Sequence, residues 1–249
     1  MHIRAVSPAG PADAHLVGFP GAGGSQSHFR GWNAPLGPRV RLSVVDPWSL
    51  YFAGQSAGVG SLRDLAALVV PELAAAGSPV ILVGHSFGAL LAFEVAHQLS
   101  TIGRQDLLAG FVAMAQRAPT SPIPATLSDR SDEELHGFLR RMGGTPEAVF
   151  AEPELLELLL RRLRDEVRLT ENYRPATHAA IDCPLRVYLG EQDTGIAPAE
   201  AHRWSASVTG AAVTRRFPGG HFFCFDDDRV ATALVEDLPE KEPFHGVRH

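Results

Sequence analysis

The chain alternates between short, continuous hydrophobic runs and longer segments whose hydrophobic residues recur at helical spacing. The short runs lack the alternation of a sheet with one wet face, so they predict parallel strands covered on both faces. The segments 61–77 and 89–103 have the helical pattern and end in glycine. Strands that alternate with helices predict an α/β fold with a mostly parallel sheet. The strand-like runs are HLVGF from His15, VRLSVVD to Asp46, PVILVGH to His85, GFVAMA to Ala115, LRVYLG to Gly190 and AVTRRF to Phe217.

One block interrupts this alternation. Residues 127–173 contain no strand pattern. Ser131 and Glu134 have the spacing of a capping box, which opens a helix, and a leucine-rich helical pattern follows from Pro153. We predict an all-helical insertion at about 120–175, too short to be an independent domain, which forms a cap on a single domain spanning residues 1–249.

Composition narrows the class of protein. A chain of 249 residues that is 45% hydrophobic suits one large domain. A net charge of -6 does not favour a nucleic-acid-binding protein. The chain has neither a run long enough for a membrane helix nor an apolar signal region, so we expect a cytoplasmic protein. Two cysteines, Cys183 and Cys224, are expected to pack in the core rather than to form a disulfide.

The run PVILVGH leads directly into Gly84-His-Ser-Phe-Gly88 and then into a helical pattern. This places a G-x-S-x-G motif at a strand–turn–helix junction, where a sharp turn presents the serine hydroxyl above the sheet. The turn also leaves the Phe87 amide free at a helix N-terminus, whose dipole favours negative charge. We predict that Ser86 is a nucleophile, against the simpler interpretation of a serine that caps a helix.

A serine nucleophile needs a base, and the chain has 11 histidines. His221 follows the last strand-like run, in a loop that can return over the sheet edge carrying Ser86, and we predict it as the base. His85 adjoins Ser86 but is expected to point away. The run LRVYLG is followed by Glu191 and Asp193. Asp193 lies further into the loop, so we predict it as the acid that orients the imidazole.

The glycine-rich stretch FPGAGGS, residues 19–25, follows the run that begins at His15. Such a loop serves either a nucleotide phosphate or the negative charge of an acyl transfer. The dinucleotide fingerprint needs a third glycine where this chain has Gln26, although Asp46 stands where a ribose-binding acid is expected. A phosphate-binding P-loop also fails, since no G-K-[ST] follows. We predict instead that the Ala22 amide is the second oxyanion donor, beside that of Phe87.

The order and spacing of these motifs resemble the type II thioesterases, the free-standing editing hydrolases of polyketide synthases and non-ribosomal peptide synthetases. The resemblance covers nearly the whole chain and rests on FPGAGGS with Trp32 downstream, GHSFGALLAFEVA, LRDEVRLTENY, LGEQD and FPGGHFF. It implies an α/β-hydrolase fold with a helical lid. Carried over by motif, the family's catalytic residues fall on Ser86, Asp193 and His221, and its oxyanion amides on Ala22 and Phe87.

The resemblance also implies a reaction and a partner. Type II thioesterases remove aberrant or stalled acyl groups from the phosphopantetheine arm of acyl or peptidyl carrier proteins. No metal or cofactor is required for this chemistry, and we expect a monomer. The chain departs from the family where DPWSLYFAGQSAG, residues 46–58, replaces a P-G-R-like stretch. We expect this stretch to be a loop that helps to shape the substrate entrance.

The insertion has two features with open interpretations. Its leucines either line an acyl chamber or pack against the main domain. Its arginines either form a basic patch that steers an acidic carrier protein or lie on a solvated helix face. The arginines concerned are Arg140, Arg141, Arg161, Arg162, Arg164 and Arg168.

Four other functions compete with an editing thioesterase. An esterase or lipase would share the fold and the triad. A chain-terminating, cyclising thioesterase domain is disfavoured because the chain starts and ends like a free-standing protein. A non-catalytic carrier-binding module and a nucleotide-dependent oxidoreductase both leave the set Ser86, Asp193 and His221 without a role.

Overall fold

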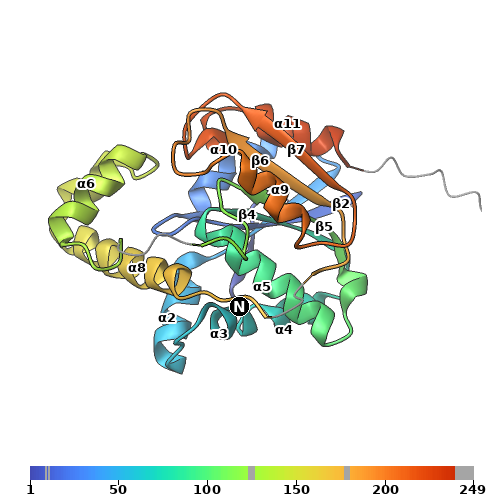
Figure 1. Ribbon diagram of the computed structural model, residues 1–249, viewed down its shortest axis with the longest axis horizontal. Helices are drawn as coiled ribbons and strands as arrows, with labels where there is room; N and C mark the ends of the chain where they lie inside the picture. Colours follow the sequence, from blue (N-terminus) through green and yellow to red (C-terminus); the bar gives the residue numbers. More distant parts are fainter. Residues whose placement is uncertain (9, 11, 123–126, 177–179, 239–249) are drawn as a thin grey trace, which may run out of the picture.

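The computed structural model describes residues 1–8, 10, 12–122, 127–176 and 180–238. A seven-stranded sheet in the order β1-β3-β2-β4-β5-β6-β7 forms its centre (Figure 1). Neighbouring strands are parallel except β1 and β3, which are antiparallel. The predicted α/β fold with a mostly parallel sheet is therefore confirmed. The strands are β1 (Ile3–Ala5), β2 (Ala14–Phe19), β3 (Val40–Val45), β4 (Val80–His85), β5 (Leu108–Met114), β6 (Leu185–Gly190) and β7 (Ala212–Phe217).

Helices cover both faces of the sheet, as continuous hydrophobic strands require. Alternate residues of β4 point to opposite faces: Leu82 belongs to one hydrophobic cluster and Val83 to the other. The first cluster includes α3 (Leu62–Ala67), α4 (Val70–Ala76), α5 (Phe87–Thr101) and α9 (Ala199–Ser205). The second includes η1 (Gln26–Trp32), α1 (Asn33–Leu36), α10 (Phe223–Asp226) and α11 (Arg229–Glu236).

Both cysteines lie in the core of the protein, as the sequence predicts. Cys183 and Cys224 are free thiols, and each is buried in one of the two clusters. The short helix η2 (Gln105–Leu107) precedes β5. Within the described residues, no helix combines the length and the apolar character needed to cross a membrane.

One predicted helix is two helices in the structure. The segment 61–77 breaks between α3 and α4, with Leu68 and Val69 between them. Pro71 lies in the first turn of α4, where its missing amide costs nothing. A continuous helix would place the proline ring against the carbonyl of Ala67, so the break is at the point where proline demands it.

The prediction of a loop at residues 46–58 is wrong, because this segment forms the helix α2 (Pro47–Ala57). The Asp46 carboxylate accepts hydrogen bonds from the amides of Trp48 and Ser49 and so caps the helix. At the other end Gly58 adopts the left-handed conformation that ends many helices. Asp46, the candidate ribose ligand, is therefore a helix cap.

The helical insertion lies between β5 and β6 and consists of α6 (Asp132–Met142), α7 (Glu147–Ala151) and α8 (Pro153–Glu171). The predicted capping box of Ser131 and Glu134 opens α6. In Figure 1 the insertion projects from the sheet on the left, in green and yellow. Part of the predicted range, residues 123–126, lies outside the described residues. The core of the insertion is a small cluster of leucines from α6 and α8, namely Leu135, Leu139, Leu159, Leu160 and Leu163.

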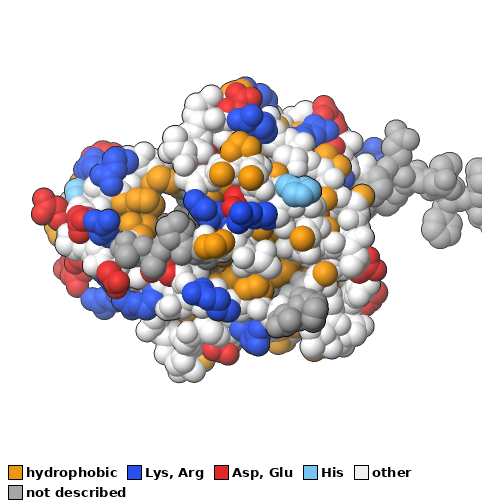
Figure 2. All heavy atoms as spheres, viewed as in Figure 1, with side chains coloured by type: hydrophobic (Ala, Val, Ile, Leu, Met, Phe, Trp, Pro, Cys, Tyr) orange, Lys and Arg blue, Asp and Glu red, His pale blue; other side chains and the backbone are white. Residues whose placement is uncertain are grey.

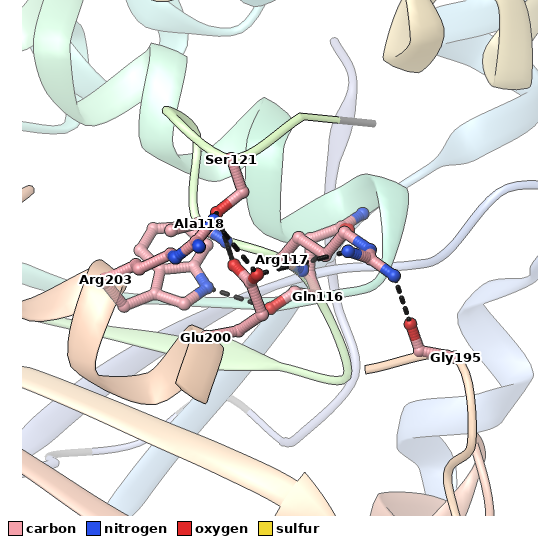
Figure 3. Close-up of polar contacts among 8 residues, drawn as sticks. Gln116, Arg117, Ala118, Ser121, Gly195, Glu200 and Arg203 are labelled. Atoms are coloured by element: carbon pink, nitrogen blue, oxygen red, sulfur yellow. Dashed lines mark hydrogen bonds and ion pairs between the residues drawn. The ribbon is translucent and has the colours of Figure 1, made fainter. Parts of the chain in front are cut away.

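Buried carboxylates attach both ends of the insertion to the main domain. At the entry, Glu200 of α9 is 3% exposed and accepts hydrogen bonds from the Ala118 amide and the Ser121 hydroxyl (Figure 3). At the exit, Glu94 of α5 is fully buried and accepts a 2.9 Å hydrogen bond from the Tyr173 hydroxyl. The insertion is thus held to the domain by side chains where it begins and where it ends.

Candidate active site

Ser86 lies on the sharp turn between β4 and α5. Its backbone has φ 52° and ψ -126°, a conformation that non-glycine residues adopt only under constraint. The glycines on either side are required by close packing. A Cβ at Gly84 would lie 2.3 Å from the Ala89 Cα, and one at Gly88 would lie 2.1 Å from the Phe19 carbonyl oxygen. The G-x-S-x-G motif therefore has the strained strand–turn–helix geometry that the sequence predicts.

The structure brings Asp193 and His221 together. The Asp193 Oδ2 lies 2.8 Å from the His221 Nδ1, and the two side chains are 5% and 15% exposed. The other carboxylate oxygen of Asp193 accepts the Gly195 amide at 2.9 Å. Arg117 donates to the Gly195 carbonyl at 3.0 Å and so connects this loop to the entry of the insertion (Figure 3). Glu191, the other candidate acid, is exposed.

His85 has a role near the site that the sequence analysis does not assign. Its ring centre lies 5.0 Å from that of His221. Its Nε2 donates to the His221 carbonyl oxygen at 2.8 Å, so it supports the His221 backbone. Complete burial holds the pKa of His85 well below its usual value, and the ring is neutral. Its place before Ser86, at the end of a fully buried strand, was the available signal.

The glycine-rich loop forms a turn around Ala22. The Gly24 amide donates to the Gly21 carbonyl at 2.8 Å. In the described part of the chain, neither the Ala22 amide nor the Phe87 amide donates to another group. Both residues line the cavity that contains Ser86. Two amides without an acceptor in the described contacts therefore belong to residues that line the same cavity as Ser86, which suits an oxyanion site.

These residues line one cavity of about 530 Å³. Its other wall is the insertion, which contributes Phe138, Leu139, Met142, Leu163 and Val167. Ser86 and His221 both line the cavity, but they make no hydrogen bond to each other among the described contacts. Catalytic hydrogen bonds often form only when substrate is bound. No cluster of three or more His, Cys, Asp or Glu side chains suited to a metal ion occurs among the described residues.

The arginines of the insertion do not form a free positive patch. Arg162 is fully buried, and four of the others have acidic partners. Figure 2 shows positive and negative side chains interspersed over this part of the surface. The pairs are Arg140–Glu147, Arg161–Glu157, Arg164–Asp132 and Arg168–Asp165. Arg141 lines the cavity and makes no ion pair within the described residues.

A protein-family model described as "Thioesterase domain" matches residues 14–241, which is most of the chain. The chain belongs to the thioesterase family. The chain is therefore a thioester hydrolase of the serine hydrolase type. The resemblance to type II thioesterases of polyketide and non-ribosomal peptide systems is confirmed by the individual relatives.

Two sequence relatives come from streptomycetes. The probable cadicidin biosynthesis thioesterase of Streptomyces griseus is 31% identical over 95% of this chain. The chain spans 65% of the length of that protein. Thioesterase PikA5 of Streptomyces venezuelae is also 31% identical, over 91% of this chain and 81% of its own length.

Solved structures of type II thioesterases share the fold. BorB, from the borrelidin biosynthetic cluster, is 32% identical with a TM-score of 0.80, over 96% of this chain and 98% of its own. YbtT, from the yersiniabactin pathway, is 28% identical with a TM-score of 0.81 over the same shares of the two chains. The α/β-hydrolase fold implied by the motifs is therefore confirmed.

Proposed function

We propose that this thioesterase removes acyl groups from the phosphopantetheine arm of acyl or peptidyl carrier proteins, with Ser86, His221 and Asp193 as its catalytic triad. The observation that carries the proposal is the convergence of three loops on one cavity. Ser86 follows β4, Asp193 follows β6 and His221 follows β7, and the Asp193–His221 hydrogen bond is already in place. The relatives from biosynthetic clusters support a carrier-bound substrate.

The proposed mechanism uses only groups of this chain. His221 takes the proton of the Ser86 hydroxyl, which attacks the thioester carbonyl. The Ala22 and Phe87 amides stabilise the oxyanion, and the pantetheine thiol leaves with a proton from His221. Water then attacks the acyl-enzyme with His221 again as base. Asp193 accepts from the His221 Nδ1–H, so the other nitrogen of the ring, Nε2, is available to face Ser86.

The insertion is the proposed lid of the acyl chamber. Its apolar residues Phe138, Met142 and Val167 form one wall of the cavity and exclude water from the acyl-enzyme.

Arg141 is the one arginine among the described residues that line the cavity, and it makes no ion pair with another described residue. Its charge suits the phosphate of the pantetheine arm. Replacing Arg141 with alanine should raise KM for a carrier substrate and leave KM for a phosphate-free thioester unchanged.

Intact mass spectrometry of an acyl-loaded carrier protein tests the proposed function. Wild-type enzyme should restore the free thiol of the carrier, and Ser86→Ala should leave the carrier loaded. An aryl ester of the same acyl group, at matched concentration, should be cleaved more slowly. If the ester is cleaved while the carrier stays loaded, the alternative of a small-ester esterase is correct.

A further inference from the structure

The loop that carries the Ala22 amide is held by two side chains from the insertion. Glu166 of α8 accepts the Gly23 amide at 2.7 Å. Arg162, one helical turn earlier, donates to the Gly24 carbonyl. The amide of Gly23 and the carbonyl of Gly24 are thus both bonded to one face of one helix. We call Arg162 and Glu166 the loop clamp.

The loop clamp is itself rigid. Its two members form an ion pair at 3.3 Å, and neither side chain is more than 8% exposed. The Arg162 guanidinium stacks on the Trp48 ring at 4.2 Å, so α2 supports it from the other side. Gly23 has φ 68°, and a Cβ there would lie 3.5 Å from Leu163 Cδ1, which shows how closely α8 approaches the loop.

Stability alone does not explain this arrangement. Burying a charged pair is costly, and hydrophobic residues of similar volume often serve as well or better. Arg162 also keeps Nη1 without a hydrogen-bond partner in the described residues, which adds to the cost. Buried polar contacts that cost stability are expected mainly at functional sites, and the contacts of Arg162 and Glu166 with the glycine-rich loop are of this kind.

We propose that Arg162 and Glu166 are positioning residues, which hold the Ala22 amide in register with Ser86 through the peptide groups of Gly23 and Gly24. This inference rests on the proposed function, since it assigns Ala22 to the oxyanion site. A displacement of about 1 Å at such a site costs on the order of 100-fold in rate. The loop clamp therefore ties the position of the Ala22 amide to the position of α8.

The decisive variant is the double substitution Arg162→Met with Glu166→Leu, which removes the loop clamp without leaving a buried charge. The chain offers a matched control in Arg161→Met with Glu157→Leu. Arg161 and Glu157 are also four residues apart on α8 and paired at 2.9 Å, but both are exposed. The two double variants change the same residue types on the same helix, and only one of them touches the loop.

Two measurements read out the clamp. The first is amide hydrogen exchange of the peptide covering residues 19–27, which needs no substrate. The second is the single-turnover rate of Ser86 acylation by a carrier thioester, with KM measured separately. We expect the clamp variant to melt within a few degrees of wild type, to lose protection in this peptide, and to acylate 10- to 100-fold more slowly at nearly unchanged KM. The control should match wild type in melting temperature, in protection and in acylation rate.

A folded clamp variant with wild-type protection and wild-type acylation would overturn the proposal. If the double variant does not fold, Glu166→Gln replaces it. Glutamine keeps an oxygen for the Gly23 amide but removes the charge that holds Arg162, so a smaller loss in the same two measurements is expected and an unchanged value contradicts the clamp. If wild-type enzyme releases no acyl group from a carrier, the proposed function fails, while the exchange data still decide whether the clamp holds the loop.

Discussion

The Phe87 amide and the Ala22 amide lie in the same cavity, but different parts of the molecule hold them. The Phe87 amide is positioned by its neighbours in sequence, since it lies between the turn at Ser86 and the first turn of α5. The Ala22 amide belongs to a loop bonded to α8, and the contacting residues are 138 and 143 positions apart in the chain. Both proposed oxyanion donors are backbone amides. One is positioned by local backbone, which we call the local half of the site, and the other is positioned by side chains distant in sequence, which we call the distant half.

This difference determines how each half fails. The local half is damaged by changes that disturb the packing of the turn, and such changes act on folding as well as on catalysis. The distant half is damaged by changes in a helix that does not touch the reacting atoms, and such changes can leave the fold intact. His221 lies between the two cases, because Asp193 orients its ring and His85 supports its backbone.

The largest expected effect is on catalysis by His221, through the residue that orients its ring. Asp193→Asn should lower kcat about 10³- to 10⁴-fold, because an amide that donates to Nδ1 favours the wrong tautomer of His221. Steady-state hydrolysis of a carrier thioester measures it. Glu191→Gln, two residues earlier and exposed, is the control and should retain activity. A loss of only a few fold in Asp193→Asn would show that another group orients the base.

The local half should break at Gly88. In Gly88→Ala the new methyl group would lie 2.1 Å from the Phe19 carbonyl oxygen, a contact with backbone that no rotamer change relieves. We expect a loss of about 3 kcal/mol or more in the free energy of unfolding, measured by urea denaturation. Gly31→Ala is the control, since a Cβ at Gly31 meets nothing within 4 Å. Equal stability of the two variants would contradict the packing argument.

The sequence could predict the local half and not the distant one. G-x-S-x-G after a buried strand defines the Ser86 turn, because backbone geometry and motif coincide. By contrast, Arg162–Glu166 and Arg161–Glu157 have the same residue types at the same spacing, and only the fold buries one pair and exposes the other. The pairs differ in their order along the helix, but neither order predicts a hydrogen bond to the glycine-rich loop.

The missed helix α2 is a different kind of failure. Its start signals were present, with an aspartate at the cap and a proline in the first turn, and Gly58 gave the end. The hydrophobic residues of this helix do not follow one face. Leu50 and Tyr51 are buried, but the adjacent Phe52 is exposed, so the sequence shows only a weak helical pattern. The capping residues therefore carried more information than the hydrophobic pattern in this segment.

A smaller effect is expected where α8 ends. Tyr173→Phe removes the hydroxyl that donates to the buried Glu94 and should cost about 1–2 kcal/mol of unfolding free energy, since the carboxylate loses a partner. Thermal and urea denaturation measure it. Tyr51→Phe, which removes a hydrogen bond to the partly exposed Asp165, should cost less. If both variants are as stable as wild type, Glu94 does not anchor the exit of the insertion.

The smallest effect concerns the pH dependence of stability. The pKa of His85 is lowered in the folded protein, so below about pH 6.5 the unfolded state binds a proton that the folded state does not. Wild type should therefore lose about 1 kcal/mol relative to His85→Gln between pH 6.5 and 5.5. Urea denaturation at the two pH values measures this, and glutamine keeps a donor for the His221 carbonyl. An unchanged difference would mean that the pKa of His85 is the same in the folded and unfolded states.

The attachment of the insertion at both ends has a consequence for engineering. Glu200 fixes the chain near Ala118 and Ser121, and Glu94 fixes it at Tyr173, so any replacement for the segment between them starts and finishes at defined points. α8 must be kept, because it holds the loop around Ala22. α6 supplies Phe138 and Met142 to the wall of the cavity, and neither α6 nor α7 makes a side-chain hydrogen bond to that loop among the described contacts. Exchanging α6 and α7 among related enzymes is therefore the direct route to a changed acyl preference while the proposed catalytic residues stay the same.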